Sequence, residues 1–184
     1  MGDDPAQGFY IGAGAGYSFI NSSVSNLTGS AELDDESFSY KVFGGYKFNQ
    51  FFSTELFYMD LGAASLTGQT GDIFQLNGTT YSFLQNATVD ASATTIGIAA
   101  QFSFPLTPHI STFAKGGGHY WDRELDFSSA TTSASESDDG IDFFYGFGAE
   151  LQIAKNIAIR GEYENFTVNN EDADIISISS KYNF

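Results

Sequence analysis

The chain ends in the stretch Ile176-Ser177-Ile178-Ser179-Ser180-Lys181-Tyr182-Asn183-Phe184, in which large apolar side chains alternate with polar ones. Successive side chains of a β-strand point to opposite faces, so Tyr182 and Phe184 lie on the same face. A closing strand with an aromatic residue at its end and another two positions earlier is typical of β-barrels that cross membranes. We therefore predict that this chain spans a membrane with strands.

The composition agrees with this prediction. The mean hydropathy of -0.14 is modest, and no apolar run approaches the roughly 20 residues that a spanning helix needs. A barrel strand turns only every second side chain toward lipid, so its average hydropathy stays low. The aromatic content of 16% fits two girdles at the membrane interfaces, and 184 residues suffice for one domain of eight strands.

Segments of alternating character recur along the chain, separated in turn by short turns and long polar connections. They predict an all-β fold, an eight-stranded antiparallel up-and-down transmembrane β-barrel formed by residues 8–184, with residues 1–7 as an N-terminal periplasmic extension. The predicted strands are residues 8–20, 38–48, 51–61, 93–104, 109–121, 141–153, 157–167 and the terminal segment. The predicted external loops are residues 21–37, 62–92, 122–140 and 168–173.

A soluble lipocalin-like barrel or a β-sandwich also alternates, but it places aromatic side chains inside and charges outside. Here the face that carries Lys41, Glu150 and Arg160 also carries glycines, whereas the opposite face carries aromatic and aliphatic side chains. Glycines fit the crowded interior of a small barrel, so this pattern favours the membrane barrel.

Charged residues on the glycine-bearing face are predicted to lie in the barrel interior. An isolated buried charge is costly, so opposite charges there are expected to pair. The interior of eight strands is just wide enough for side chains, which favours a static polar core. The predicted interior residues are Lys41, Glu55, Lys115, Glu150, Arg160, Glu162, Glu164 and Lys181.

The chain resembles the eight-stranded barrel domain of the outer membrane protein A-like family of Gram-negative bacteria, including the small opacity-type and outer membrane protein X-like surface barrels. The resemblance lies in pattern more than in unique motifs, and it concerns fold more than function. It is carried by Gly8-Phe9-Tyr10-Ile11-Gly12-Ala13, Thr54-Glu55-Leu56-Phe57-Tyr58-Met59-Asp60-Leu61-Gly62, Phe104-Pro105-Leu106-Thr107-Pro108, Lys115-Gly116-Gly117-Gly118, Gly148-Ala149-Glu150-Leu151 and Arg160-Gly161-Glu162-Tyr163.

The resemblance implies that the interior charges plug the barrel and act as a gate. It implies that Tyr182 and Phe184 are the signal that the barrel assembly machinery recognises. It also implies an integral protein of the bacterial outer membrane, in contact with lipids and lipopolysaccharide, with extracellular loops and both termini in the periplasm. Members often continue into a domain that binds peptidoglycan. We interpret Phe184 as a natural end, and Met1 as a start that replaces a removed secretion signal.

Most of the 23 acidic residues fall in the predicted loops, where Arg123 is the one basic residue. The resulting field repels nucleic acid and attracts cations or basic partner surfaces. The cluster Glu136-Ser137-Asp138-Asp139 offers oxygens to calcium, but its spacing matches no calcium-binding loop, and a solubilising role is favoured. The apolar residues between Ile73 and Leu84 indicate either strand extension or a binding surface.

An enzyme is the interpretation that the residues support least. His109 and Ser111 share a strand face but lie at a short turn, away from the leaflet where lipid-modifying barrels act, and His119 is expected at the membrane interface. Cysteine is absent, which excludes disulfides and thiolate metal sites. We predict no catalytic residues, no metal site and no cofactor.

The predicted function is therefore display. A monomeric, non-enzymatic barrel would stabilise the envelope and present acidic loops, as a surface antigen or as an adhesin for a host or matrix partner. The alternative is a small gated pore for ions or solutes, controlled by Arg160, Glu55 and Glu150.

Overall fold

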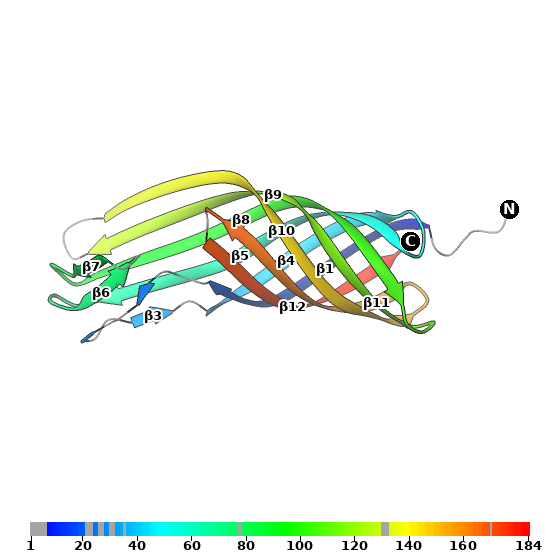
Figure 1. The fold of residues 1–184 in the computed structure, drawn as a ribbon, viewed down its shortest axis with the longest axis horizontal. Helices are drawn as coiled ribbons and strands as arrows, with labels where there is room; N and C mark the ends of the chain where they lie inside the picture. The colour runs from blue at the N-terminus through cyan, green and yellow to red at the C-terminus, as the bar shows by residue number, and fades with distance from the viewer. Residues whose placement is uncertain are drawn as a thin grey trace.

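The computed structural model describes residues 7–20, 24–25, 28–29, 32–34, 36–76, 79–129, 133–169 and 171–184. Every regular element of these residues is a strand, and Figure 1 shows an elongated, twisted barrel with the beginning of β1 and the C-terminus at the same end of the molecule. The strands are β1 (Gly8–Ile20), β2 (Val24–Ser25), β3 (Glu32–Asp34), β4 (Glu36–Lys47), β5 (Phe52–Gly68), β6 (Ile73–Leu76), β7 (Thr79–Ser82), β8 (Ala87–Pro105), β9 (Ile110–Ser129), β10 (Ser133–Ala154), β11 (Ile157–Val168) and β12 (Glu171–Asn183). Among the described residues, no helix is long and apolar enough to cross a bilayer.

Eight strands close into the barrel in the order β5-β4-β1-β12-β11-β10-β9-β8, with β5 and β8 paired to complete the ring. All these pairings are antiparallel, and the terminal strand β12 lies between β1 and β11. Closure satisfies the backbone hydrogen bonds that an open sheet edge would leave unpaired in lipid. The predicted fold class is confirmed.

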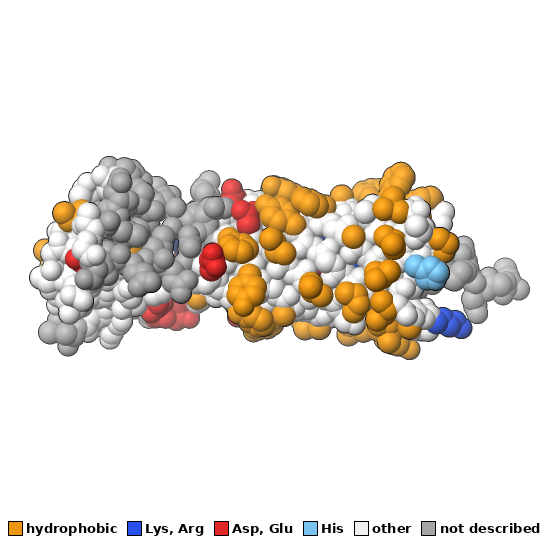
Figure 2. Space-filling model, turned by 90° about the horizontal axis from the view of Figure 1, so that it is seen from below, with side chains coloured by type: hydrophobic (Ala, Val, Ile, Leu, Met, Phe, Trp, Pro, Cys, Tyr) orange, Lys and Arg blue, Asp and Glu red, His pale blue; other side chains and the backbone are white. Residues whose placement is uncertain are grey.

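The alternation of the sequence becomes the inside and outside of this barrel. On β12, Ile176, Ile178 and Tyr182 face outward, whereas Ser177 and Lys181 are buried. Outward apolar side chains form a band around the half of the molecule that is nearer the chain termini, and acidic side chains appear beyond its margin (Figure 2). An apolar band of this kind is the surface that faces lipid in a transmembrane barrel.

Inward glycines are required because the interior is narrow. A Cβ added to Gly45 would lie 2.4 Å from the ring of Tyr10, and one added to Gly148 would lie 2.7 Å from Phe113. By contrast, Gly161 points outward, and a Cβ there would meet nothing within 4 Å. The prediction that the glycine-bearing face is the crowded interior is confirmed at these positions.

Four strands are longer than the sequence pattern suggested. β5, β8, β9 and β10 contain 17, 19, 20 and 22 residues, against 12 or 13 in β1, β4, β11 and β12. The parts of these four strands that continue past the shorter ones, residues 61–68, 87–94, 122–129 and 133–140, form what we call the extended wall. They run toward the end of the molecule opposite the termini, where β6 and β7 also lie (Figure 1).

Much of the expected loops 62–92 and 122–140 is therefore strand. The polar residues of the extended wall were predicted to be loop, but they continue the alternation of inward and outward side chains along these strands. One apolar cluster supports the wall from within: Leu66, Phe83 and Ala87 pack together, and Val89 and Phe127 pack against them. On β5 a bulge between Asp60 and Gly62 shifts the register, and Gly62 adopts a φ of 87° there. Residues 1–6 of the expected N-terminal extension lie outside the described residues.

Candidate functional site in the barrel interior

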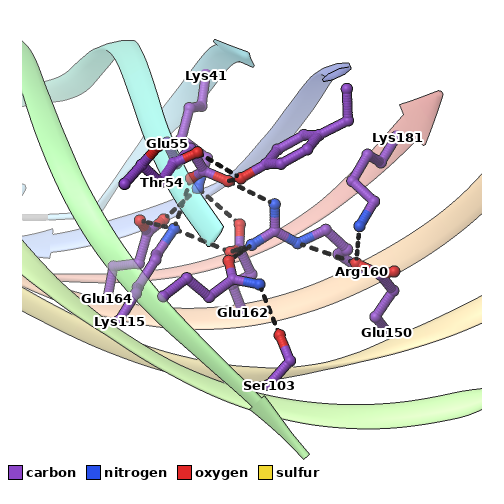
Figure 3. Close-up of polar contacts among 12 residues, drawn as sticks. Lys41, Thr54, Glu55, Ser103, Lys115, Glu150, Arg160, Glu162, Glu164 and Lys181 are labelled. Carbon is purple, nitrogen blue, oxygen red and sulfur yellow. Dashed lines mark hydrogen bonds and ion pairs between the residues drawn. The ribbon is translucent and has the colours of Figure 1, made fainter. Parts of the chain in front are cut away.

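The eight charged residues predicted for the interior all lie inside the barrel. Six strands contribute them, and each of the eight is at most 8% exposed. Four are cations and four are carboxylates, so the group as a whole is neutral. Figure 3 shows their side chains converging on the barrel axis.

Arg160 and Lys115 occupy the centre of this network. Arg160 contacts Glu55 at 2.8 Å and Glu162 at 2.7 Å, and its Nε lies 3.9 Å from Glu150. Lys115 contacts Glu164 at 2.7 Å, Glu162 at 2.9 Å and Glu55 at 3.2 Å. Each central cation is thus shared by three carboxylates.

The two remaining cations lie on either side of this centre. Lys41 contacts Glu162 at 2.6 Å and Glu164 at 2.8 Å. Lys181 is paired with Glu150. Because these ions are withdrawn from water, their mutual contacts have to compensate for a large loss of hydration.

Uncharged side chains complete the coordination of Arg160. One Nη donates a hydrogen bond to Gln101 Oε1 at 2.9 Å, and the guanidinium carbon lies 4.5 Å and 4.9 Å from the ring centroids of Phe113 and Phe43. Tyr10 donates to Thr54 O at 3.2 Å and to Glu55 Oε2 at 3.4 Å. These partners were not predicted from the sequence, although Gln101, Phe43 and Phe113 occupy inward positions of their strands.

Small residues in the neighbouring strands give the long charged side chains room. In the β-sheet register, Lys41 is opposite Gly14, Glu162 is opposite Gly148 and Lys115 is opposite Gly146. An interior only wide enough for side chains could not hold eight long charged groups beside large neighbours. The glycines and the charges are therefore one structural feature.

An aromatic layer covers the network on the side of the extended wall. The rings of Phe144 and Phe166 stack with centroids 4.8 Å apart, and Phe57 meets Phe144 edge-on at 4.9 Å. His119 packs against both stacked rings, and its Nδ1 lies 2.7 Å from the hydroxyl of Thr95. This layer fills the barrel with largely apolar side chains.

The expectation that His119 lies at the membrane interface is wrong. It is 2% exposed and faces inward, because Lys115, Gly117 and His119 occupy alternate positions of β9 and share its inner face. Trp121 continues this face and donates from Nε1 to Asp142 at 2.8 Å. The three glycines after Lys115 obscured the pattern.

The other predicted residues lie away from the interior. Tyr182 and Phe184 point outward, with ring centroids 5.1 Å apart. His109 is exposed in the turn before β9, and the contacts found for the described residues include no hydrogen bond between His109 and Ser111. In the part of the chain that the structure describes, no group of three or more His, Asp or Glu side chains could hold a metal ion.

The family model described as the OmpA-like transmembrane domain matches residues 4–183. The chain belongs to this family. Outer membrane protein A of Yersinia pseudotuberculosis serotype I (strain IP32953) is 24% identical over 188 residues, which cover 96% of this chain and 48% of that protein. Outer membrane protein A of Serratia marcescens is 25% identical over 177 residues, which cover 91% of this chain and 44% of that protein. This OmpA-like chain thus spans less than half the length of these relatives.

Solved structures share the barrel at low sequence identity. Ail, the attachment invasion locus protein of Yersinia pestis, in complex with the heparin analogue sucrose octasulfate, has a TM-score of 0.61 at 16% identity, covering 97% of this chain and 99% of that one. OprG of Pseudomonas aeruginosa has a TM-score of 0.62 at 12% identity, covering 97% and 96%. Neisserial surface protein A has a TM-score of 0.60 at 17% identity, covering 96% and 97%. These structures show the same fold, and the family match together with the outer membrane protein A relatives makes the OmpA-like chain an integral outer-membrane barrel.

Proposed function

We propose that this protein is a non-enzymatic surface barrel that attaches to basic surfaces of extracellular partners through its extended wall. The unequal length of the strands carries this proposal. A tilted strand needs about 9–11 residues to cross a bilayer, so strands of 12 or 13 residues suffice. The additional 4 to 10 residues of β5, β8, β9 and β10 amount to roughly 13–33 Å of strand held outside the membrane.

The outer face of the extended wall has the composition of a water-exposed surface. Residues that lie opposite each other on neighbouring strands of this face mostly carry hydroxyl groups or carboxylates. The membrane-spanning parts of the same strands carry apolar side chains at the outward positions. Asp122 lies opposite Asp139, and Asp90 lies opposite Asp126. The outward positions are Ala63, Ser65, Thr67, Thr88, Asp90, Ser92, Thr94, Asp122, Glu124, Asp126, Ser128, Ser133, Ser135, Ser137 and Asp139.

One edge of the wall has no strand beside it in the described register. The pairing of β10 with β11 extends only to Phe144 and Phe166, whereas the pairing of β10 with β9 continues to Ser133. On the side of β10 away from β9, no described strand pairs with residues 133–143. Such an edge can accept an extended segment of a partner by main-chain hydrogen bonds.

Charge selects the class of partner. Like charges placed directly opposite on a sheet repel each other, and a cationic partner relieves this repulsion. The related barrel Ail was crystallised with a sulfated heparin analogue. A chain with a net charge of -16 and five outward carboxylates on its wall is expected to repel such a polyanion.

The packing of side chains inside the barrel favours a closed barrel over a pore. The ion network fills the barrel over one stretch, and the stacked rings of Phe144 and Phe166 fill the next. Ions would have to pass both layers, and the second contains few groups that could replace their hydration. The alternative function, a pore gated by Arg160, Glu55 and Glu150, would require a second opening at the aromatic layer.

Attachment can be tested with cells that display the protein. We expect wild-type cells to adhere to immobilised extracellular matrix, and the variant Asp122→Asn/Glu124→Gln/Asp126→Asn to lose most of this adhesion. Lys155→Gln, which changes an exposed charge at the opposite end, is the matched control. Equal adhesion by the wall variant at equal surface expression would contradict the proposal. Adhesion that is unchanged by added heparin at constant ionic strength would also contradict it, because a soluble polyanion competes with the acidic wall for a basic partner surface.

A further inference from the structure

A cavity of about 310 Å³ opens at the end of the barrel where the short turns lie. It is enclosed by the ends of β4, β8, β9, β10 and β12 and by the turns between β4 and β5 and between β8 and β9. Nine of its twelve lining residues carry polar or charged side chains, and the cavity reaches inward to the ion pair of Lys181 and Glu150. The residues around it are Lys47, Gln50, Ser103, Pro105, Thr107, Pro108, His109, Ile110, Ser111, Glu150, Gln152 and Lys181.

This cavity has an excess of positive charge in a chain that is otherwise strongly acidic. All seven lysines and arginines are among the residues that the structure describes, and five of them form ion pairs with other described residues. Lys47 and Lys155 form none, and Lys47 lines the cavity. Glu150 is the one carboxylate in the lining, and it is already engaged by Lys181.

We propose that this cavity binds a small oxyanion, through its phosphate or carboxylate oxygens, between Lys47 and Lys181. Lys47 is half-buried, so its ammonium group is less screened by water than that of an exposed lysine. The Lys181 ammonium group is shared with Glu150, so an incoming oxyanion competes with that carboxylate for it. Hydroxyl and amide groups of the lining can donate further hydrogen bonds.

The charges of the lining favour an anion over a cation. A metal cation would meet one carboxylate that is already paired, next to two ammonium groups. An oxyanion would instead meet the ammonium group of Lys47, which has no ion partner among the described residues, and that of Lys181, which can be shared. Lys155 lies at the same end of the barrel but outside the lining, so it supplies a matched control for the contribution of Lys47.

The two histidines of the chain allow a direct test by NMR. His109 lines the cavity, whereas His119 is buried among Phe144 and Phe166 and serves as an internal reference. Protein labelled with ¹⁵N-histidine would be folded in phospholipid-free micelles and titrated with inorganic phosphate, and separately with acetate, at constant pH and ionic strength. We expect a saturable shift of the His109 signals and no shift of the His119 signals.

Substitutions of Lys47 and Lys155 test whether phosphate binding depends on the cavity. Lys47→Gln is expected to weaken phosphate binding at least tenfold, while Lys47→Arg and Lys155→Gln retain it. An unchanged His119 signal in each variant verifies that the barrel is folded. A shift that grows linearly without saturation, or an equal affinity in Lys47→Gln, would overturn the proposal.

A second arm distinguishes a free ion from a lipid headgroup. In nanodiscs without added phosphate, a Lys47-dependent shift that appears with phosphatidylglycerol would identify the headgroup as the source of the oxyanion. If the shift requires added phosphate or acetate in those nanodiscs, the site binds the free ion. If neither arm gives a Lys47-dependent shift, the cavity is no oxyanion site.

Discussion

Replacing Arg160 by alanine tests whether the interior network holds the barrel together. The change removes contacts of 2.8 Å to Glu55 and 2.7 Å to Glu162, and it leaves four carboxylates to share three lysines. Breaking a buried ion pair by removing one partner costs about 3–5 kcal/mol, because the other partner stays buried and uncompensated. Loss of the packing between Phe43 and Phe113 adds to this cost.

A destabilisation of about 4 kcal/mol lowers the folding equilibrium constant by a factor of about 10³. The assay is urea-induced unfolding in lipid vesicles, followed by the fluorescence of Trp121, the single tryptophan, which is buried inside the barrel. Lys155→Ala is the control, since an exposed turn residue should change the unfolding free energy by less than about 0.5 kcal/mol.

A double variant separates the charge effect from lost packing. Arg160→Ala/Glu55→Gln restores neutrality inside the barrel, with three lysines and three glutamates remaining. We expect it to recover about 1–3 kcal/mol relative to Arg160→Ala alone, as the coupling between contacting charges. If Arg160→Ala is within about 0.5 kcal/mol of wild type, or if the two changes add without coupling, the ion network does not stabilise the fold.

Three further predictions follow from the same geometry. Gly45→Ala should destabilise the barrel by about 1–3 kcal/mol in the urea assay, whereas Gly161→Ala should be neutral or slightly stabilising, since only the first added methyl meets neighbouring atoms. In planar bilayers both wild type and Arg160→Ala should be silent, and discrete current steps from Arg160→Ala alone would show that the aromatic layer does not seal the barrel. Phe184→Ala should slow insertion by the barrel assembly machinery without lowering the final stability by more than about 1 kcal/mol, as measured by gel-shift kinetics in reconstituted vesicles; an unchanged rate would dissociate Phe184 from recognition.

Within the membrane, the alternation of the sequence was sufficient to predict the strands and most of their faces, with His119 on β9 as an exception. Lipid on one side and a narrow interior on the other make every second position strongly constrained, so Lys41, Glu150 and Arg160 could be assigned to the interior from parity alone. Which charges pair could not be predicted. Lys41 and Glu164 are 123 positions apart in the chain, and their contact depends on the tilt and stagger of strands around the barrel.

Beyond the membrane, the alternation of the sequence did not reveal the strands, and the reason is physical. On β9 the outward positions change from apolar to acidic at Asp122 because water replaces lipid, so the strand resembled a loop. The inner face of β9 still alternates, through Leu125 and Phe127, and this was the signal that could have been found.

The inward position of Phe144 in the barrel interior was not predicted. Phe143 and Tyr145 flank it, so aromatic side chains lie on both faces of β10 and their alternation alone does not mark the inner face.

The distribution of charge allows the stability of the barrel and the attachment by its surface to be tested separately. The interior ions cancel, four against four, so the net charge of -16 resides outside the network. The outward carboxylates of the wall, such as Glu124, share no partner with Arg160 or Lys115 in the contacts found for the described residues. Changes at sites without shared partners usually add within about 0.3–0.5 kcal/mol. Neutralising the wall should therefore abolish attachment while the unfolding free energy stays near that of wild type, and a loss of attachment that instead tracks Arg160→Ala would assign the activity to the interior.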